Sequence, residues 1–241
     1  GLSTQSAREV LPHPPEEERT ELSTIFYAID NEWSTDPDDA IGYDGKFYWV
    51  HVADPASSVF PDSKIDIDAR HRGTTLYLPE HTSRMLNEDC LEDYALGLTE
   101  KSNALSFKIT LDENANIIDT EVLKTRIKVK CLSYEQADEL KESDELKPLF
   151  EIAKKFEQKR QASGSVQIQL PEVHIKIENS EEYKNKVTIY ESKHTESSQV
   201  VKEFMLMAGE AAARFAFKNQ IPFPFISQDE PDIPKEIPEG L

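Results

Sequence analysis

Residues 105–130 carry the pattern that most restricts the fold of this chain. The segment Leu105–Leu111 (LSFKITL) alternates apolar and polar residues, and a second β-prone run spans residues 117–130. Only the short turn sequence DENAN separates the two runs. Alternation with a period of two on both sides of a polar turn predicts an antiparallel β-hairpin. Any fold for this chain must accommodate that hairpin.

Helical signals follow the hairpin. Ser133 is followed three residues later by a glutamine, a capping-box signature that predicts a helix through Glu142. Apolar residues at helical spacing predict a second helix over residues 146–162, with Gly164 as its stop. Small and apolar residues line one face of residues 197–219, which predicts a long helix with a buried face.

Because most predicted strands precede the helices, the order of elements favours an α+β fold. We expect a mixed or antiparallel sheet packed with helices. Further strands are predicted over residues 24–30, 46–54, 166–176 and 186–192, and a short helix over residues 65–72.

The length of 241 residues suits one large domain with a substantial core. Three prolines and a run of glutamates predict that residues 1–22 are a tail or linker, so the domain is expected to span residues 23–241. Two cysteines cannot form a disulfide framework, which favours a reducing compartment, and we expect the cytoplasm. No apolar run approaches the roughly 20 residues that span a bilayer, so no membrane span is expected.

The acidic side chains are concentrated in one loop. Asp30, Asp36, Asp38 and Asp39 fall within ten residues, directly after a predicted strand. Residues 20–44 contain seven acidic side chains and no Lys or Arg. Carboxylates packed without cations have raised pKa values and cost stability unless a cation is supplied. Hard oxygen ligands on a short loop suit Mg²⁺.

The residues of this loop also allow comparison with a solvated acidic turn and with a calcium loop. A loop rich in aspartate is most often a solvated acidic turn, and that interpretation stays open on the local sequence. A calcium loop beginning at Asp36 would need glycine where Ile41 stands and a bidentate glutamate where Phe47 stands. The calcium interpretation therefore fails.

Six motifs, taken in order, resemble one known family. The stretch AIDNEWSTDPDDAI resembles the signature of the ribonuclease II / RNase R family catalytic domain, the RNB domain, in which a strand ending in Ile-Asp leads to an Asp-x-Asp-Asp-Ala loop. The Asp loop alone is moderately specific, whereas six ordered motifs over residues 18–225 are a strong match. The other five motifs are YWVHVADPASSV, RGTTLYLPEHTSRML, LGLTEKSNALSFKITLDENANI, CLSYEQADELKE and SSQVVKEFMLMAGEAAARF.

The resemblance implies a function. It predicts a Mg²⁺-dependent 3′-to-5′ exoribonuclease that hydrolyses single-stranded RNA processively to nucleoside 5′-monophosphates. One or two Mg²⁺ ions are expected, and Mn²⁺ can substitute. Carried over by motif, Asp30 and Asp39 are metal ligands, and Asp38 is the aspartate on which the chemistry most depends. Asp36 supports both the catalytic and the metal-binding set.

Three residues are expected to contact RNA. Tyr77 matches the family's aromatic residue that stacks on a base, a contact that tolerates any sequence; a half-buried strand tyrosine is the alternative. Tyr134 matches a tyrosine near the terminal ribose, and a tyrosine packed on the hairpin is equally compatible. Ile168 stands where the family has a stacking phenylalanine, so the clamp on the terminal bases is expected to differ. His51 is expected to be structural.

Two further departures concern the end of the chain. The family's Arg-rich motif, which grips the scissile phosphate, does not follow the proline-rich segment after residue 219. No OB-type or cold-shock RNA-binding module flanks the domain. We therefore expect the N-terminal two-thirds of an RNB catalytic domain, a fragment rather than a shortened homologue. The missing RNA-binding modules are expected on the same or another chain.

A second function belongs to another class. A catalytically inactive RNB-like module could bind RNA or serve as a scaffold in an RNA-degradation complex; the missing arginine motif and Ile168 favour it, while the four aspartates favour the enzyme. A cation-binding protein without an RNA role would require the ordered motifs to be coincidental. The net charge of −19 argues against a basic RNA-binding surface, but the motifs outweigh it. An organelle is the alternative compartment, and no sequence feature sets the oligomeric state.

Overall fold

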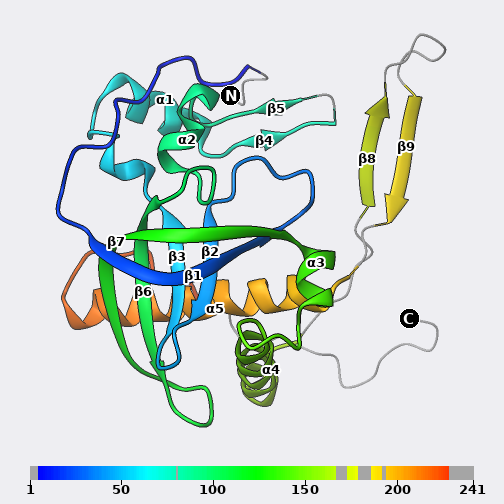
Figure 1. The fold of residues 1–241 in the computed structure, drawn as a ribbon. Helices are drawn as coiled ribbons and strands as arrows, with labels where there is room; N and C mark the ends of the chain where they lie inside the picture. The colour runs from blue at the N-terminus through cyan, green and yellow to red at the C-terminus, as the bar shows by residue number, and fades with distance from the viewer. Residues whose placement is uncertain (1–4, 80, 167–172, 179–185, 192–193, 228–241) are drawn as a thin grey trace, which may run out of the picture.

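Five strands close into a barrel at the centre of the molecule, seen here in a computed structural model that describes residues 5–79, 81–166, 173–178, 186–191 and 194–227 (Figure 1). Neighbouring strands are antiparallel, except that the first and last run parallel where they close the barrel. The predicted mixed sheet and α+β class are therefore confirmed. In barrel order the strands are β1 (Thr20–Asp30), β2 (Asp39–Tyr43), β3 (Tyr48–Ala53), β6 (Ser102–Leu111) and β7 (Ile117–Ser133).

The predicted hairpin is formed by β6 and β7, which pair from Ser102↔Ile127 to Leu111↔Ile117. Its turn is held by one side chain. Asp112 Oδ1 accepts the backbone N–H groups of Asn114 and Asn116 at 2.9 and 2.8 Å, an Asx-type arrangement that favours a tight turn. The local sequence therefore determines both the pairing and the connection.

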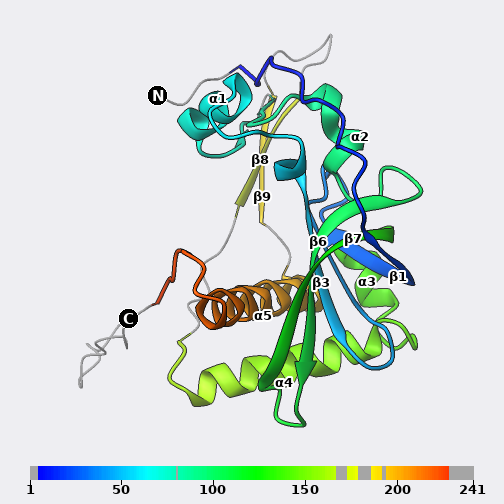
Figure 2. The same cartoon turned by 90° about the vertical axis from the view of Figure 1, so that its left-hand side faces the viewer.

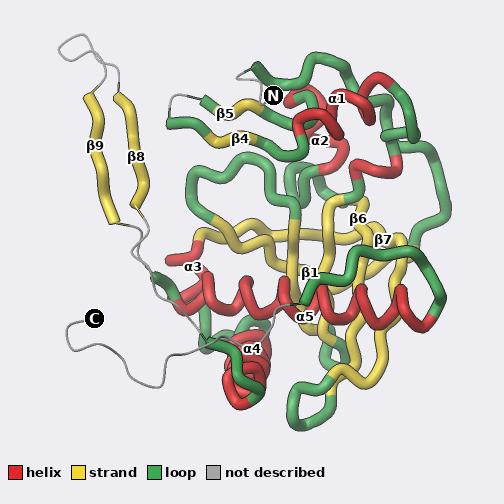
Figure 3. The backbone as a smooth tube through the Cα atoms, turned by 180° about the vertical axis from the view of Figure 1, so that it is seen from behind, coloured by secondary structure: helices red, strands yellow, loops and turns green. Residues whose placement is uncertain are grey.

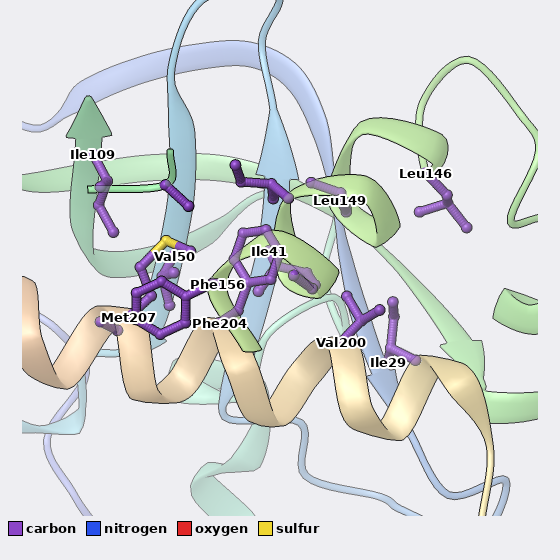
Figure 4. Packing of buried hydrophobic residues seen from close by; sticks show 14 of the residues in the cluster. Ile29, Ile41, Val50, Ile109, Leu146, Leu149, Phe156, Val200, Phe204 and Met207 are labelled. Atoms are coloured by element: carbon purple, nitrogen blue, oxygen red, sulfur yellow. The ribbon is translucent and has the colours of Figure 1, made fainter. Parts of the chain in front are cut away.

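Two helices cover one side of the barrel, namely α4 (Lys147–Ala162) and α5 (Glu196–Lys218). Phe204 and Met207 of α5 pack with Phe156 of α4 against Ile41 and Val50 of the barrel (Figure 4). All five side chains are buried. Burying a large apolar side chain contributes roughly 1.5–3 kcal/mol, so this contact fixes the helices on the barrel.

The segment between β3 and β6 lies at the opposite end of the barrel from α4 and α5 (Figure 2). The predicted short helix is confirmed as α1, which begins after the cap Ser63 and ends at Gly73, a residue with φ of 74°. The segment consists of a 3₁₀ turn (Pro55–Ser57), α1 (Lys64–Arg72), β4 (Leu76–Tyr77), β5 (Thr82–Ser83), a second 3₁₀ turn (Glu88–Cys90) and α2 (Leu91–Tyr94).

One helix and one hairpin complete the described elements. The predicted capping box at Ser133 is present and opens α3 (Tyr134–Glu139), which ends earlier than the predicted Glu142. An antiparallel hairpin of β8 (Val173–Glu178) and β9 (Lys186–Glu191) stands apart from the barrel (Figure 3). None of the described helices is long and apolar enough to cross a membrane.

Two sequence-based expectations were wrong. A polar loop is predicted over residues 31–40, but Asp39 and Ala40 are the first residues of β2, whose backbone pairs with β3 from Asp39↔Val52 to Tyr43↔Tyr48. Residues 1–22 were predicted as a tail or linker, yet β1 begins at Thr20 and Leu11 is buried. The segment that precedes β1 packs against the rest of the protein, where the Leu11 N–H donates to Cys90 Sγ at 3.2 Å.

Candidate active site at the aspartate loop

The acidic loop, residues 31–38, joins β1 to β2 and lies beside the β4–β5 hairpin (Figures 1 and 3). Two backbone hydrogen bonds fix its end. Leu96 N–H donates to the Pro37 carbonyl at 2.8 Å, and Ala53 N–H donates to the Asp38 carbonyl at 2.8 Å. The loop is therefore held by the segment that follows α2 and by the end of β3.

Strand ends position two of the predicted aspartates. Asp30 is the last residue of β1, and its Oδ1 accepts the N–H of Asn31 at 2.7 Å. Asp39 is the first residue of β2 and pairs with Val52. Regular barrel strands therefore hold both carboxylates, while Asp36 and Asp38 come from the loop between them.

The cluster is electrostatically unfavourable without a cation. Partial burial, together with the charges of Asp38 and Asp30, raises the pKa of Asp39 to about 7. Loss of hydration, with Asp30 and Asp36 nearby, also raises the pKa of Asp38, although this residue is exposed on its outer side. Each of the two neighbouring carboxylates disfavours the ionised form of the other, so the cluster favours a bound cation.

Asp36 has a cationic partner that the local sequence does not contain. Arg84 Nη1 donates to Asp36 Oδ2, and Arg84 Nη2 donates to Thr35 Oγ1 at 2.9 Å. Both charged side chains are largely buried. Residues 20–44 contain no Lys or Arg, and the fold supplies a cation for Asp36 by bringing in an arginine from 48 residues away.

The remaining carboxylates fit a hard divalent cation in an open site. Among the described residues, no three His, Cys, Asp or Glu side chains converge closely enough to enclose a metal ion. Mg²⁺, however, commonly takes only one or two protein carboxylates and completes its shell with water and phosphate. Asp30, Asp38 and Asp39 offer oxygen donors and excess negative charge, so their chemistry suits such a site.

Two predicted RNA contacts lie around the loop. The parallel pairing of Asp30 with Ser133 brings Tyr134, the first residue of α3, beside the cluster. Partial burial and the charges of Asp30 and Asp39 raise the pKa of Tyr134 to about 12, so its phenol stays protonated and can donate. Tyr77 lies on β4 with its side chain exposed. It lines the same hollow as Asp30 and Asp36.

The other residues singled out from the sequence have simpler positions. Ile168 lies outside the described residues. His51 is structural, as expected: it is fully buried in the barrel, and its Nδ1 lies 2.6 Å from Ser106 Oγ. Cys90 is buried, Cys131 is exposed, and both are free thiols.

Three residues of the site were missed by sequence reasoning. Arg84 pairs with Asp36, Trp33 lines the hollow beside the loop, and Tyr94 lies within the electrostatic reach of Asp36. Trp33 could have been identified, because a tryptophan inside a polar acidic loop is unusual for a solvated turn. Arg84 and Tyr94 carry no local signal, since their contacts depend on the folding of the segment between β3 and β6.

The fold and the site define a class of domain: a closed five-stranded barrel that carries aspartates at the connection of its first two strands. The chain matches the RNB domain over residues 19–236. It therefore belongs to the RNB domain family, and the resemblance read from the sequence is confirmed.

Relatives of known name support this membership. An uncharacterized ribonuclease of Synechocystis sp. is 35% identical over 238 residues, covering 93% of this chain and 35% of the relative. Ribonuclease II, chloroplastic/mitochondrial, of Arabidopsis thaliana is 35% identical over 231 residues, covering 89% of this chain and 29% of the relative. The structure of Mycoplasma genitalium RNase R in complex with ribose-methylated single-stranded RNA superposes with a TM-score of 0.74 at 25% identity, covering 84% of this chain and 34% of that one. The chain spans about a third of the length of these relatives.

Proposed function

We propose that the chain carries the active site of a Mg²⁺-dependent 3′-to-5′ exoribonuclease that hydrolyses single-stranded RNA processively to nucleoside 5′-monophosphates. The main support is the gathering of four aspartates at the β1–β2 connection in a chain whose relatives are ribonucleases. The 3′-to-5′ direction, the products and the processivity come from the family resemblance.

The aspartates have separate roles in this proposal. Asp30 and Asp39 hold Mg²⁺, or Mn²⁺ in its place, because regular strands fix both carboxyls beside other acidic groups. Asp38 acts on the substrate, since it is the exposed carboxylate of the cluster. The pairing of Asp36 with Arg84 favours a role in holding the loop over a role as a ligand.

Bound Mg²⁺ would activate water for attack on phosphorus and offset the charge that develops on the phosphate. The protein side chains position the water and the RNA. Asp38 orients the attacking water, and loss of hydration raises the pKa of its carboxyl. Tyr134, protonated throughout this range, donates a hydrogen bond to the terminal ribose. Tyr77 supports a base by stacking.

The partner in this proposal is single-stranded RNA, with additional RNA-binding modules on the same or another chain. The acidic composition supports this division of roles, because a net charge of −19 repels the phosphate backbone. The cytoplasm is the proposed compartment. An organelle is the alternative, in line with the name of the Arabidopsis relative.

The test is a cleavage assay on 5′-labelled single-stranded RNA with Mg²⁺, Mn²⁺ or EDTA. We expect release of nucleoside 5′-monophosphates and shortening from the 3′ end, only with a divalent cation. Asp38→Asn should abolish cleavage and leave RNA binding largely intact. Undiminished turnover by this variant would overturn the assignment of Asp38. RNA binding without cleavage under any of these conditions would instead support the inactive-module function.

A further inference from the structure

Four cations lie on the outer face of β7. Residues 122–134 contain four Lys or Arg and no Asp or Glu, in a chain whose net charge is −19. Thr125 and Ile127 are fully buried in the barrel, and neighbouring side chains of a strand point to opposite sides. The residues that alternate with them therefore point outward, and we call them the basic stripe: Lys124, Arg126, Lys128 and Lys130.

The half of the basic stripe nearer the start of β7 carries surface ion pairs. Lys124 Nζ donates to Glu17 Oε2 at 2.5 Å. Arg126 Nη1 lies 3.5 Å from Glu21 Oε1. The two cationic side chains are still 55% and 42% exposed. Exposed ion pairs stabilise a protein little, so an incoming anion can displace these carboxylates at small cost.

The other half of the basic stripe has no such partners. Lys128 and Lys130 are exposed, and neither forms an ion pair with a residue that the structure describes. In the parallel pairing of β7 with β1, Lys128 lies beside Ile25 and Lys130 beside Tyr27 (Figure 1). The charge of Glu145 acts on the Tyr27 phenol but makes no ion pair with either lysine. Two ammonium groups therefore face the surface beside uncharged side chains.

The basic stripe begins close to the aspartate loop. Asp30 pairs with Ser133, which lies three residues beyond Lys130 in the sequence. A strand rises about 3.3 Å per residue, so Lys130 lies about 10 Å along β7 from the level of Asp30, and the stripe extends about 20 Å further. Alternate residues are about 6.6 Å apart, which is close to the separation of successive phosphates in an extended single strand. The stripe thus offers cations at the spacing of a nucleic-acid backbone along a path that leads to the aspartates.

We propose that the basic stripe binds the backbone of single-stranded RNA on the 5′ side of the nucleotides that enter the aspartate site. This inference rests on the proposed function for the identity of the ligand. Phosphates need cations to bind an otherwise acidic protein, and the stripe supplies four of them in one row. Lys128 and Lys130 are therefore positioning residues of the substrate strand. The net charge does not reveal the stripe, because it is a sum over the whole chain.

Salt dependence tests the stripe directly, because each phosphate contact that is lost lowers the salt slope of binding. The probe is 5′-fluorescein dodeca-uridylate, titrated by anisotropy against an Asp38→Asn parent that prevents turnover. Mg²⁺ is held constant while KCl is varied from about 50 to 200 mM. Lys128→Gln/Lys130→Gln should lower the slope of log affinity against log salt by about 0.7 for each lysine, and weaken binding about 5- to 25-fold near 0.1 M salt. Lys128→Arg/Lys130→Arg should keep both the slope and the affinity.

Lys154→Gln/Lys155→Gln is the matched control. Both lysines are exposed on α4, so this change removes the same charge outside the basic stripe. The control should have the slope of the Asp38→Asn parent. A change confined to the stripe variant therefore reports local contacts with phosphate rather than the net charge of the protein.

An unchanged slope in the stripe variant, an equal change in the α4 control, or no measurable binding of the probe by the parent would overturn the proposal. Fluorescein-labelled dodeca-glutamate tests the alternative ligand. If it binds as tightly as the RNA and loses the same affinity in the stripe variant, the stripe is instead a docking surface for an acidic polypeptide.

These results are distinguishable from failure of the proposed function. A lowered slope in the stripe variant, with no hydrolysis by the protein that retains Asp38, leaves the RNA contact standing. Hydrolysis that depends on Asp38, with an unchanged slope in the stripe variant, leaves the exoribonuclease standing.

Discussion

Arg84 and Asp36 form an ion pair across the acidic loop, although 48 residues separate them in the chain. Only 11% of the Arg84 side chain and 17% of the Asp36 side chain are exposed. The same guanidinium also donates to Thr35. A single arginine therefore ties the loop to the segment between β3 and β6 and neutralises one aspartate of the cluster of four.

Removing this arginine should destabilise the protein. We expect Arg84→Gln to lower the free energy of unfolding by about 1–3 kcal/mol, because Asp36 would be left largely buried without its partner. Urea unfolding measures the loss. The double variant Arg84→Gln/Asp36→Asn should lose less than the sum of the single variants, with a coupling of about 1–2 kcal/mol.

The pair between Arg70 of α1 and Asp62, which precedes the helix, provides the control, because both side chains are well exposed. Arg70→Gln should change stability little, since exposed pairs contribute little. If the Arg84 and Asp36 substitutions were additive in the double variant, the ion pair would not be what holds the loop.

Mg²⁺ should stabilise the folded protein through Asp39. The folded pKa of about 7 lies above the unfolded value of 3.8, so this carboxyl costs stability that grows as pH rises from about 4 to about 7. A bound cation removes that cost. At a Mg²⁺ concentration of 100 times Kd, binding adds about 2.7 kcal/mol, or roughly 5–10 °C in Tm for a chain of this size.

Asp39→Asn should raise Tm in EDTA above that of the unmodified protein and abolish most of the increase with Mg²⁺. Thermal unfolding at about pH 7.5, with EDTA or millimolar Mg²⁺, makes the comparison. Asp144→Asn changes an exposed aspartate outside the loop and should leave the response intact. An unchanged Mg²⁺ response in Asp39→Asn would show that the cation binds elsewhere.

The parts of the fold that could be predicted have local causes. The β6–β7 hairpin follows from alternation and from the turn at Asp112, and α3 follows from the capping box at Ser133. The strand β2 was missed because its five residues, including Gly42, carry no alternation that identifies them. They become a strand only by pairing with β3 and β1, which is a property of the closed barrel.

In the candidate site, too, the features with local causes could be predicted and those that depend on tertiary structure could not. Four aspartates fall within ten residues of the sequence, so the acidic loop could be located directly. The charge balance around it could not, because Arg84 reaches Asp36 only through the tertiary structure. Arg160 and Glu203 repeat the situation in the core, where a pair 43 residues apart joins α4 to α5 at 2.5 and 2.8 Å. Ion-pair partners that are distant in the sequence can be identified only once the fold is known.

The barrel histidine should make stability depend on pH. Burial lowers the pKa of His51 to about 3, against 6.5 in the unfolded chain. Below about pH 6.5 the His51 side chain therefore binds a proton in the unfolded chain but not in the folded protein, so the free energy of unfolding falls as pH decreases. The contribution of His51 should fall by about 2 kcal/mol between about pH 7.5 and pH 5.

His51→Gln removes the titrating group and should flatten that part of the profile. Asp39 acts in the opposite direction in this range, but it is present in both proteins, so the difference between their urea profiles isolates His51. His71→Gln, an exposed change on α1, should follow the unmodified protein. Parallel curves for His51→Gln and the parent would contradict the assignment.

A last prediction links packing behind the loop to the site. Gly97 has φ of 81°, and a Cβ there would meet Cys131 Sγ at 2.8 Å; Gly73 has φ of 74° with open space around it. Both alanine variants should lose about 1–2 kcal/mol from the left-handed backbone, and Gly97→Ala a further 1–3 kcal/mol from overpacking. Adding Cys131→Ala should recover part of that second loss. Equal losses of stability in the two glycine variants would rule out the contact with Cys131.

The same substitution should affect the site. Because the Leu96 N–H donates to the Pro37 carbonyl at the end of the acidic loop, Gly97→Ala should also weaken the Mg²⁺-dependent rise in Tm, whereas Gly73→Ala should not.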